Sequence, residues 1–337
     1  MKTVKVAILG FGGIGKLHNN SYRALEREGY KIKLCAVCEK NVESVMAQTK
    51  INLGNDVEPL ADDVRIYSDV EELLSNEDFD LADICLPTVL HKQMTIKMLE
   101  AGKHVLCEKP MALRSEDCVE MVEAARRSGR RLMIAQCLRF DPNYNYFKKC
   151  YEDNTFGQLK YVTAHRLCDY PRWSPTFADL EKTGGCILDT HIHDIDVLRY
   201  ILGDPQRISA TAYNKMPFCQ VVNSRLDYSD FSAHVECCWD ESRAVPFEAG
   251  FRAIFENATL VCDSSKVLVY ENGMEPYTAA IDHENYITGE IREIADLILD
   301  EKRENTVNSP ESSWESVRLI EMLKLSAEQG GAVLEVK

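Results

Sequence analysis

The sequence predicts an α/β protein of two domains, a doubly wound parallel sheet followed by an α/β domain with an open, largely antiparallel sheet. In the first part of the chain, short apolar segments rich in β-forming residues alternate with helical segments, a pattern typical of parallel strands joined by helices. Beyond Arg139, strand-like segments follow one another with few helices between them. The length of 337 residues is enough for two cores. We expect the domains at residues 1–138 and 139–337.

The first apolar strand, Val4–Leu9, leads directly into a glycine-rich turn. The turn reads Gly10-Phe11-Gly12-Gly13-Ile14-Gly15, and a helical segment follows it. In this G-x-G-x-x-G pattern Gly10 permits the tight turn, Gly12 lets the backbone approach a pyrophosphate, and Gly15 lets the helix pack close to its strand. The helix N-terminus offers free N–H groups and a partial positive charge to the phosphates. The pattern predicts a dinucleotide site, and a purely structural turn is the alternative.

A second apolar strand, residues 32–38, ends in Glu39. An acidic residue at this place holds the ribose hydroxyls in a dinucleotide-binding fold. Glu39 would repel a 2′-phosphate, so the sequence favours NAD over NADP. The adjacent Lys40 softens that preference and keeps NADP possible.

The composition argues against several classes of protein. With 45% hydrophobic and 28% charged residues, the chain has an ordinary globular composition. Its net charge of −15 argues against a nucleic-acid partner. We expect no membrane span and no signal peptide, because no apolar run is long enough and the N-terminus enters a strand at once. The 13 cysteines are scattered and mostly lie in apolar strands, so we expect reduced thiols in a cytoplasmic protein.

Four further segments complete the predicted parallel sheet. They are residues 64–67, 81–86, 104–107 and 131–136, and helices at 69–74 (capped by Ser68), 91–101 and 115–127 alternate with them. Ligands lie beyond the carboxyl ends of such strands, which selects Pro87, Thr88, Glu108, Lys109 and Arg139. Pro110 restricts Lys109 to an extended backbone, so its ammonium can be aimed at the crevice; a solvated surface lysine is the alternative. His91, taken alone, is better explained as a structural residue at a helix start.

The second half is predicted to hold strands at residues 161–167, 208–213, 231–239, 251–255 and 267–270, with late helices at 290–300 and 313–329. Between the first two strands lies a dense polar cluster, residues 183–196. On one helix, Asp189, His193 and Asp196 would line a polar stripe beside an apolar one. Two acids and an imidazole on one face suit proton transfer, and the alternative is a helix N-terminal acid with a hydrogen-bonded core histidine.

The pair His191-x-His193 raises the possibility of a metal site. Two residues along a helix are about 200° apart, so these imidazoles diverge. We therefore expect no metal.

These motifs together resemble the Gfo/Idh/MocA oxidoreductases, a family that includes glucose–fructose oxidoreductase and inositol dehydrogenases. The resemblance covers nearly the whole chain. It is carried by the glycine turn, by Pro87-Thr88 with His91, and by the run from Ala101 to Pro110 (AGKHVLCEKP). It continues with Arg139-Phe140-Asp141-Pro142 and with Gly184-Gly185 leading to Asp189, His193 and Asp196.

The resemblance implies a Rossmann domain joined to an α/β domain, with oligomerisation through the open sheet, so we expect a homodimer or homotetramer. It implies NAD(P)-dependent oxidation or reduction of a secondary alcohol or carbonyl on a sugar, polyol or inositol. Lys109, Asp189 and His193 match the catalytic trio. The expected cofactor contacts are Gly10, Gly12, Gly13, Ile14, Gly15, Glu39, Lys40, Pro87, Thr88, His91, Glu108 and Lys109, and the expected substrate contacts are Lys109, Arg139, Arg166 and Asp196.

The resulting hypothesis is reversible hydride transfer between the nicotinamide and a carbinol carbon. His193 would be the general base, Asp189 would orient it, and Lys109 would hydrogen-bond the reacting oxygen. Three alternatives stay open: a glycosidase that uses bound NAD for transient oxidation, a reductase acting on a nucleotide sugar or amino sugar, and a non-catalytic NAD-binding regulator.

Overall fold

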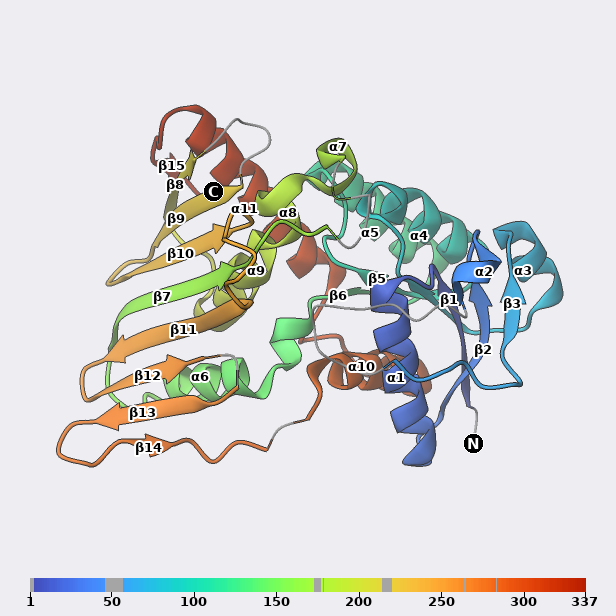
Figure 1. Cartoon of the computed structure of the whole chain (residues 1–337), viewed down its shortest axis with the longest axis horizontal. Helices are drawn as coiled ribbons and strands as arrows, with labels where there is room; N and C mark the ends of the chain where they lie inside the picture. The colour runs from blue at the N-terminus through green and yellow to red at the C-terminus, as the bar shows by residue number, and fades with distance from the viewer. Residues whose placement is uncertain are drawn as a thin grey trace. The chain divides into compact units, whose positions relative to one another are not determined.

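The computed structural model describes residues 3–45, 57–172, 177, 179–213, 220–263, 265–282 and 284–337. The chain forms two compact units. The first consists of Met1–Cys137 with Asn285–Trp314, and the second of Leu138–Glu284 with Glu315–Lys337 (Figure 1). The predicted division after residue 138 therefore needs a correction, because the segment Asn285–Trp314 returns to the first unit.

The first unit is built on a six-stranded parallel sheet. Its strands are β1 (Val4–Leu9), β2 (Ile32–Cys38), β3 (Arg65–Tyr67), β4 (Leu81–Ile84), β5 (His104–Glu108) and β6 (Leu132–Ala135). They lie in the order β3-β2-β1-β4-β5-β6, and every neighbouring pair is parallel. This order places a topological switch point between β1 and β4, where doubly wound folds bind their ligands. The predicted doubly wound sheet is confirmed.

Helices connect these strands. They are α1 (Gly13–Arg27), α2 (Val42–Val45), α3 (Val70–Asn76), the 3₁₀ turn η1 (Thr88–Leu90), α4 (His91–Glu100) and α5 (Ser115–Ser128). A second 3₁₀ turn, η2 (Cys137–Phe140), follows β6. The predicted cap of α3 was one residue off, because Asp69 rather than Ser68 accepts the N–H groups of Glu71 and Glu72.

Helix α10 (Tyr286–Leu299) is the late addition to the first unit. It packs against α1, and the hydroxyl of Thr288 donates to that of Ser21 at 3.1 Å. Its N-terminus is capped by Asn285, whose Oδ1 accepts the N–H groups of Ile287 and Thr288. A helix far along the chain thus completes the core of the first domain.

The second unit is built on a nine-stranded sheet. Its strands are β7 (Leu159–Leu167), β8 (Arg207–Tyr213), β9 (Val221–Asp227), β10 (Ser232–Cys238), β11 (Glu248–Phe255), β12 (Ala258–Cys262), β13 (Val267–Glu271), β14 (Tyr277–Thr278) and β15 (Leu334–Glu335). Their order is β14-β13-β12-β11-β7-β10-β9-β8-β15, and only β7 and β10 pair in parallel. The predicted open, largely antiparallel sheet is confirmed, although β9, β12, β14 and β15 were not predicted.

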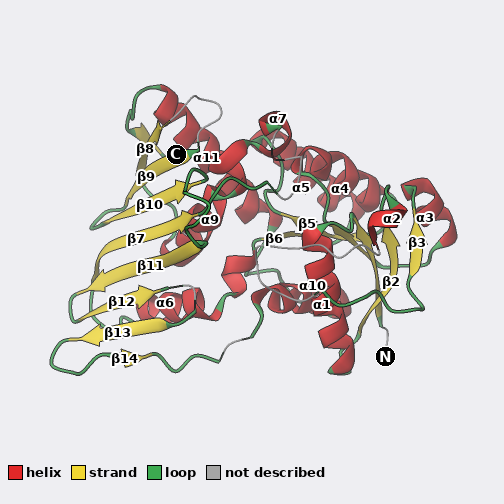
Figure 2. Cartoon of the chain, in the orientation of Figure 1, coloured by secondary structure: helices red, strands yellow, loops and turns green. Residues whose placement is uncertain are grey.

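Helices cover one face of this sheet (Figure 2). They include α6 (Pro142–Glu152), α8 (Gly185–Asp189) and α9 (His191–Leu202), with α7 (Leu180–Thr183) preceding α8 and α11 (Pro310–Glu328) near the end of the chain. The ring of Phe147 on α6 stacks on Phe251 of β11, with centroids 5.1 Å apart. Along β7, Val162 and Ala164 are buried, whereas the alternate residue Thr163 stays partly exposed. The second face of the sheet is therefore the more open one.

Two predictions about these helices were wrong. The single helix expected to carry Asp189, His193 and Asp196 is interrupted at Thr190, with φ −107° and ψ −46°, so Asp189 ends α8 and His193 lies on α9. Helix α11 begins at Pro310, three residues before the predicted start at residue 313. Among the described residues, no helix is both long and apolar enough to cross a membrane.

Candidate functional site

The glycine turn between β1 and α1 has the geometry that a pyrophosphate requires. Gly10 has φ +90°, and a Cβ there would lie 2.6 Å from the backbone oxygen of Cys85. A Cβ on Gly15 would lie 2.3 Å from the backbone oxygen of Gly10, whereas one on Gly12 would meet no atom of the described part of the chain within 4 Å. The three glycines therefore have separate roles: Gly10 and Gly15 hold the turn together, and Gly12 leaves open space above it.

The N-terminus of α1 faces that open space without a capping side chain. Gly12 occupies the N-cap, makes no side-chain hydrogen bond, and no acidic residue lies in the first turn. The unpaired N–H groups and the helix dipole therefore favour an anion. The residues present fit the pyrophosphate of a dinucleotide.

Glu39 lies directly beside this turn. Its Oε2 accepts the N–H of Phe11 at 2.9 Å, and its Oε1 accepts the N–H of Asn41 at 3.0 Å. The carboxylate is thus fixed at the carboxyl end of β2, next to the glycine turn. A carboxylate has about four lone-pair sites, so both oxygens can still accept ribose hydroxyls.

The carboxyl ends of β4 and β5 carry the other predicted residues of this unit. Thr88 is buried in η1, and His91 is buried at the start of α4. The ring nitrogens of His91 lie 2.8 and 2.7 Å from the backbone oxygens of Pro110 and Leu86. The imidazole therefore ties the end of β4 to the turn after β5, which agrees with a structural role; its contact with a cofactor stays a prediction.

Lys109 follows β5 in that turn. Its side chain is partly exposed, and its peptide bond to Pro110 is cis. The backbone N–H of Lys109 donates to Oε2 of the buried Glu108 at 3.1 Å. Glu108 also accepts a hydrogen bond at Oε1 from His18, a fully buried residue of α1 that sequence reasoning missed.

In the second unit, Asp189 ends α8 and is partly exposed. The indole N–H of Trp239 donates to the hydroxyl oxygen of Thr190 at 2.7 Å, and that hydroxyl donates to Oδ2 of Asp189 at 3.3 Å. Trp239 and Thr190 were not predicted, since they lie on different elements far apart in sequence. Their chain of hydrogen bonds holds the Asp189 carboxylate in one orientation.

The two histidines of α9 have different environments. His191 is fully buried, and its Nε2 lies 2.7 Å from the hydroxyl of Ser224. Burial lowers the pKa of His191 to about 3, so it is neutral. His193 is partly exposed. The candidate metal-ligand clusters among the described residues involve neither imidazole.

The remaining predicted charged residues form buried ion pairs. The guanidinium of Arg139 donates to both oxygens of Asp196, at 2.8 and 2.6 Å, and each side chain is only 1% exposed. Ser316 also donates to Asp196 at 2.6 Å. Arg166 makes the same kind of two-contact pair with the buried Asp194. Substrate contacts by Arg139, Arg166 and Asp196 stay a prediction, since each charged group already has a protein partner.

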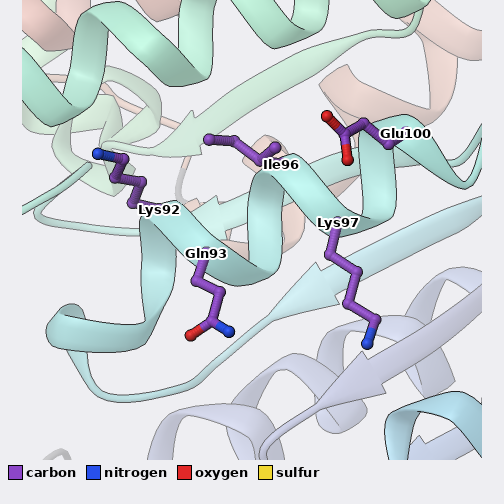
Figure 3. Close-up of a pocket in the computed structure, with 5 residues that line it drawn as sticks. All are labelled: Lys92, Gln93, Ile96, Lys97 and Glu100. Carbon is purple, nitrogen blue, oxygen red and sulfur yellow. The ribbon is translucent and has the colours of Figure 1, made fainter.

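A shallow hollow on α4 is a second place that a ligand could touch (Figure 3). It is lined by Lys92, Gln93, Ile96, Lys97 and Glu100. Both lysines are already paired, Lys92 with Asp117 and Glu120 and Lys97 with Glu71. The hollow therefore offers no unpaired cation and carries no chemistry of its own.

The fold and the glycine turn define an NAD-binding Rossmann protein with a second, open-sheet domain. Residues 4–136 match the family model described as "Oxidoreductase family, NAD-binding Rossmann fold", and residues 144–261 match the model "GFO/IDH/MocA C-terminal domain". The chain belongs to the Gfo/Idh/MocA family of oxidoreductases, and its cofactor is a nicotinamide dinucleotide of the NAD type.

Several known proteins are similar to this chain. D-glucoside 3-dehydrogenase of Escherichia coli is 29% identical over 63% of this chain and 57% of its own length. Myo-inositol 2-dehydrogenase of Thermotoga maritima is 27% identical over 60% of this chain and 55% of its own length. The chain thus spans little more than half the length of these relatives. The aldose-aldose oxidoreductase of Caulobacter crescentus has the same fold, with a TM-score of 0.84, 21% identity and coverage of 99% of this chain and 100% of its own.

Proposed function

We propose that this protein is an NAD-dependent dehydrogenase that interconverts a secondary alcohol and a ketone on a sugar, polyol or inositol-like substrate. One observation carries the proposal. Lys109, Asp189 and His193 are each partly exposed, whereas the expected substrate contacts Arg139 and Asp196 are buried in an ion pair with each other. A side chain that is to meet a substrate must keep such exposure.

The three residues have complementary roles. The imidazole of His193 takes the hydroxyl proton during oxidation and returns it during reduction, because an imidazole titrates near neutral pH. Asp189, oriented through Thr190, holds that imidazole in its productive tautomer. The ammonium of Lys109 donates to the reacting oxygen and stabilises the negative charge that develops on it.

NAD, when bound, supplies the acceptor for the hydride. Within the first unit, the glycine turn would hold the pyrophosphate and Glu39 the ribose hydroxyls. Lys40, Pro87, Thr88, His91 and Glu108 complete the proposed cofactor-binding set. Glu39 favours NAD over NADP, because its fixed carboxylate repels a 2′-phosphate. The ratio of KM values for NADH and NADPH tests this preference, and a lower KM for NADPH would reject it.

We further propose that the protein is a cytoplasmic homo-oligomer that associates through the open face of the nine-stranded sheet. The cysteines within the described ranges are all free thiols, which supports a reducing compartment. The sheet face opposite α6 and α9 carries partly exposed residues such as Tyr161 and Thr163. Light scattering after gel filtration tests the association, and a monomer at micromolar concentration would reject it.

The dehydrogenase proposal is tested by following absorbance at 340 nm with NAD and a panel of polyols, aldoses and inositols. A dehydrogenase produces NADH in proportion to substrate consumed. A glycosidase of the same fold would turn over its substrate with no net absorbance change, and a regulator would bind NAD with no turnover.

A further inference from the structure

A buried cluster of ionisable groups lies inside the first unit, next to the turn that carries Lys109. Its centre is His18 on α1, which is fully buried. On one side its Nδ1 lies 2.8 Å from Oδ2 of Asp83, which also accepts a hydrogen bond from the hydroxyl of Tyr22 at 2.9 Å. On the other side its Nε2 lies 3.0 Å from Oε1 of Glu108. The imidazole thus bridges two carboxylates from neighbouring strands.

The surroundings hold this imidazole in its charged form. Burial lowers the pKa of His18, but the charges and hydrogen bonds of Asp83 and Cys85 together outweigh burial and raise the pKa well above its ordinary value. The cluster is completed by Cys85, whose Sγ lies 3.6 Å from Nδ1, and by Glu290 of α10. Burial and the negative charge of Glu108 raise the pKa of Glu290 well above its usual range, which favours the neutral carboxyl group.

Glu108 connects this cluster to Lys109. One of its oxygens accepts from His18 and the other accepts the backbone N–H of Lys109 at 3.1 Å. Both oxygens of one rigid carboxylate are therefore engaged, and the backbone of Lys109 is held at a fixed distance from the imidazolium. If His18 were lost, the Glu108 carboxylate would lose the cationic partner that the described residues give it and would be free to rotate away from the Lys109 amide.

We propose that His18 is a positioning residue, which holds the Glu108 carboxylate and through it fixes the backbone from which the Lys109 ammonium reaches the substrate. The expected effect of His18 on turnover rests on the proposed function of Lys109. The expected effect of His18 on the position of the Lys109 backbone does not. A network of this kind does not touch the reacting atoms, but a small displacement of a catalytic group lowers turnover strongly.

Glu290 provides a matched control within the same cluster. Its Oε1 lies 3.9 Å from Nε2 of His18, and neither of its carboxyl oxygens has a hydrogen-bond partner among the described residues. A neutral carboxyl group without partners can be replaced by an amide of the same shape at little cost. Glu290→Gln should therefore leave the network intact, whereas His18→Gln and Glu108→Gln should break it.

The test measures the Lys109 backbone and the turnover separately. Protein labelled with ¹⁵N-lysine reports hydrogen exchange of the Lys109 amide, which is assigned from its absence in Lys109→Arg. His18→Gln should speed this exchange and lower kcat, each by about tenfold or more, with substrate KM changed by less than about threefold. Glu290→Gln should match the wild type in the exchange rate of the Lys109 amide, in kcat and in the substrate KM. Should His18→Gln fail to fold, Glu108→Gln must give the same pattern.

The possible outcomes are distinct. Wild-type exchange at Lys109 in a folded His18→Gln protein would overturn the proposal. Faster exchange in a protein whose wild type turns over no polyol or sugar would uphold the positioning of the backbone and refute the dehydrogenase function instead. A stoichiometric metal ion in the purified wild type that is lost in His18→Gln would also overturn the proposal, because His18, Glu108 and Glu290 would then be metal ligands rather than a hydrogen-bonded network.

Discussion

Replacing Gly12 by alanine should weaken cofactor binding without destabilising the fold. Gly12 has φ −74°, which any L-residue adopts, and an added Cβ would meet no atom of the residues that the structure describes within 4 Å. At a helix N-cap, alanine is less favourable than glycine by less than about 1 kcal/mol. Alanine also lowers the conformational entropy of the unfolded chain, which stabilises the folded protein by about 0.4–1 kcal/mol and offsets the loss at the cap. For a domain of this size we therefore expect the Tm to change by less than about 2 °C.

The cofactor, in contrast, should bind more weakly to Gly12→Ala. The methyl group would stand in the open space through which a pyrophosphate reaches the N–H groups of α1. We expect the Kd for NADH, measured by calorimetry, to rise at least tenfold, which corresponds to about 1.4 kcal/mol. Unchanged affinity for NADH in this variant would refute the assignment of the turn as the pyrophosphate site.

Gly15→Ala is the matched control. Its Cβ would lie 2.3 Å from the backbone oxygen of Gly10, so the helix must move away from the strand. We expect a loss of about 1–3 kcal/mol in the free energy of unfolding, seen as a lower Tm without any cofactor present. Gly12→Ala should thus be detected by weaker NADH binding, and Gly15→Ala by a lower Tm of the protein without cofactor.

Three other predictions concern the second unit. Thr190→Val removes the acceptor of the buried Trp239 N–H, so it should lower the free energy of unfolding by about 1–3 kcal/mol and reduce kcat, whereas Thr190→Ser should retain both. Asp196→Asn leaves the buried Arg139 charge without its ion partner and should cost about 3–5 kcal/mol in urea unfolding; wild-type stability with a raised substrate KM would instead identify Asp196 as a substrate contact. His191, with a folded pKa of about 3 against 6.5 in the unfolded chain, stays neutral while the unfolded state binds a proton. As the pH falls below 6.5, it should therefore remove up to about 1.4 kcal/mol of stability per pH unit, and this slope should be smaller in His191→Asn.

The parts of the fold that local sequence determines could be predicted. The glycine turn, the acid after β2 and the alternation of apolar strands with helices are all encoded within short segments, and the structure has each of them where the sequence indicates. The break at Thr190 was missed because the apolar stripe continues past it, so the pattern alone reads as one helix.

Contacts between distant segments could not be predicted in the same way. Helix α10 shows an amphipathic pattern but nothing in its sequence says which domain it covers. His18 and Tyr22 lie four residues apart on the buried face of α1, and two polar residues on an apolar stripe were the available indication of a buried network. Their partners Asp83 and Glu290 come from other elements, so only the folded chain identifies them.

The central claim is that Lys109 and His193 act in NAD-dependent oxidation of a secondary alcohol. The most direct measurement is NADH formation at saturating NAD on the best substrate of the panel, compared between the wild type, Lys109→Ala and His193→Ala. We expect steady NADH production by the wild type and a loss of about 10²–10³ in kcat for Lys109→Ala, with a large loss for His193→Ala as well. Near-normal kcat in both variants, or no NADH from any polyol, aldose or inositol with the wild type, would contradict the account.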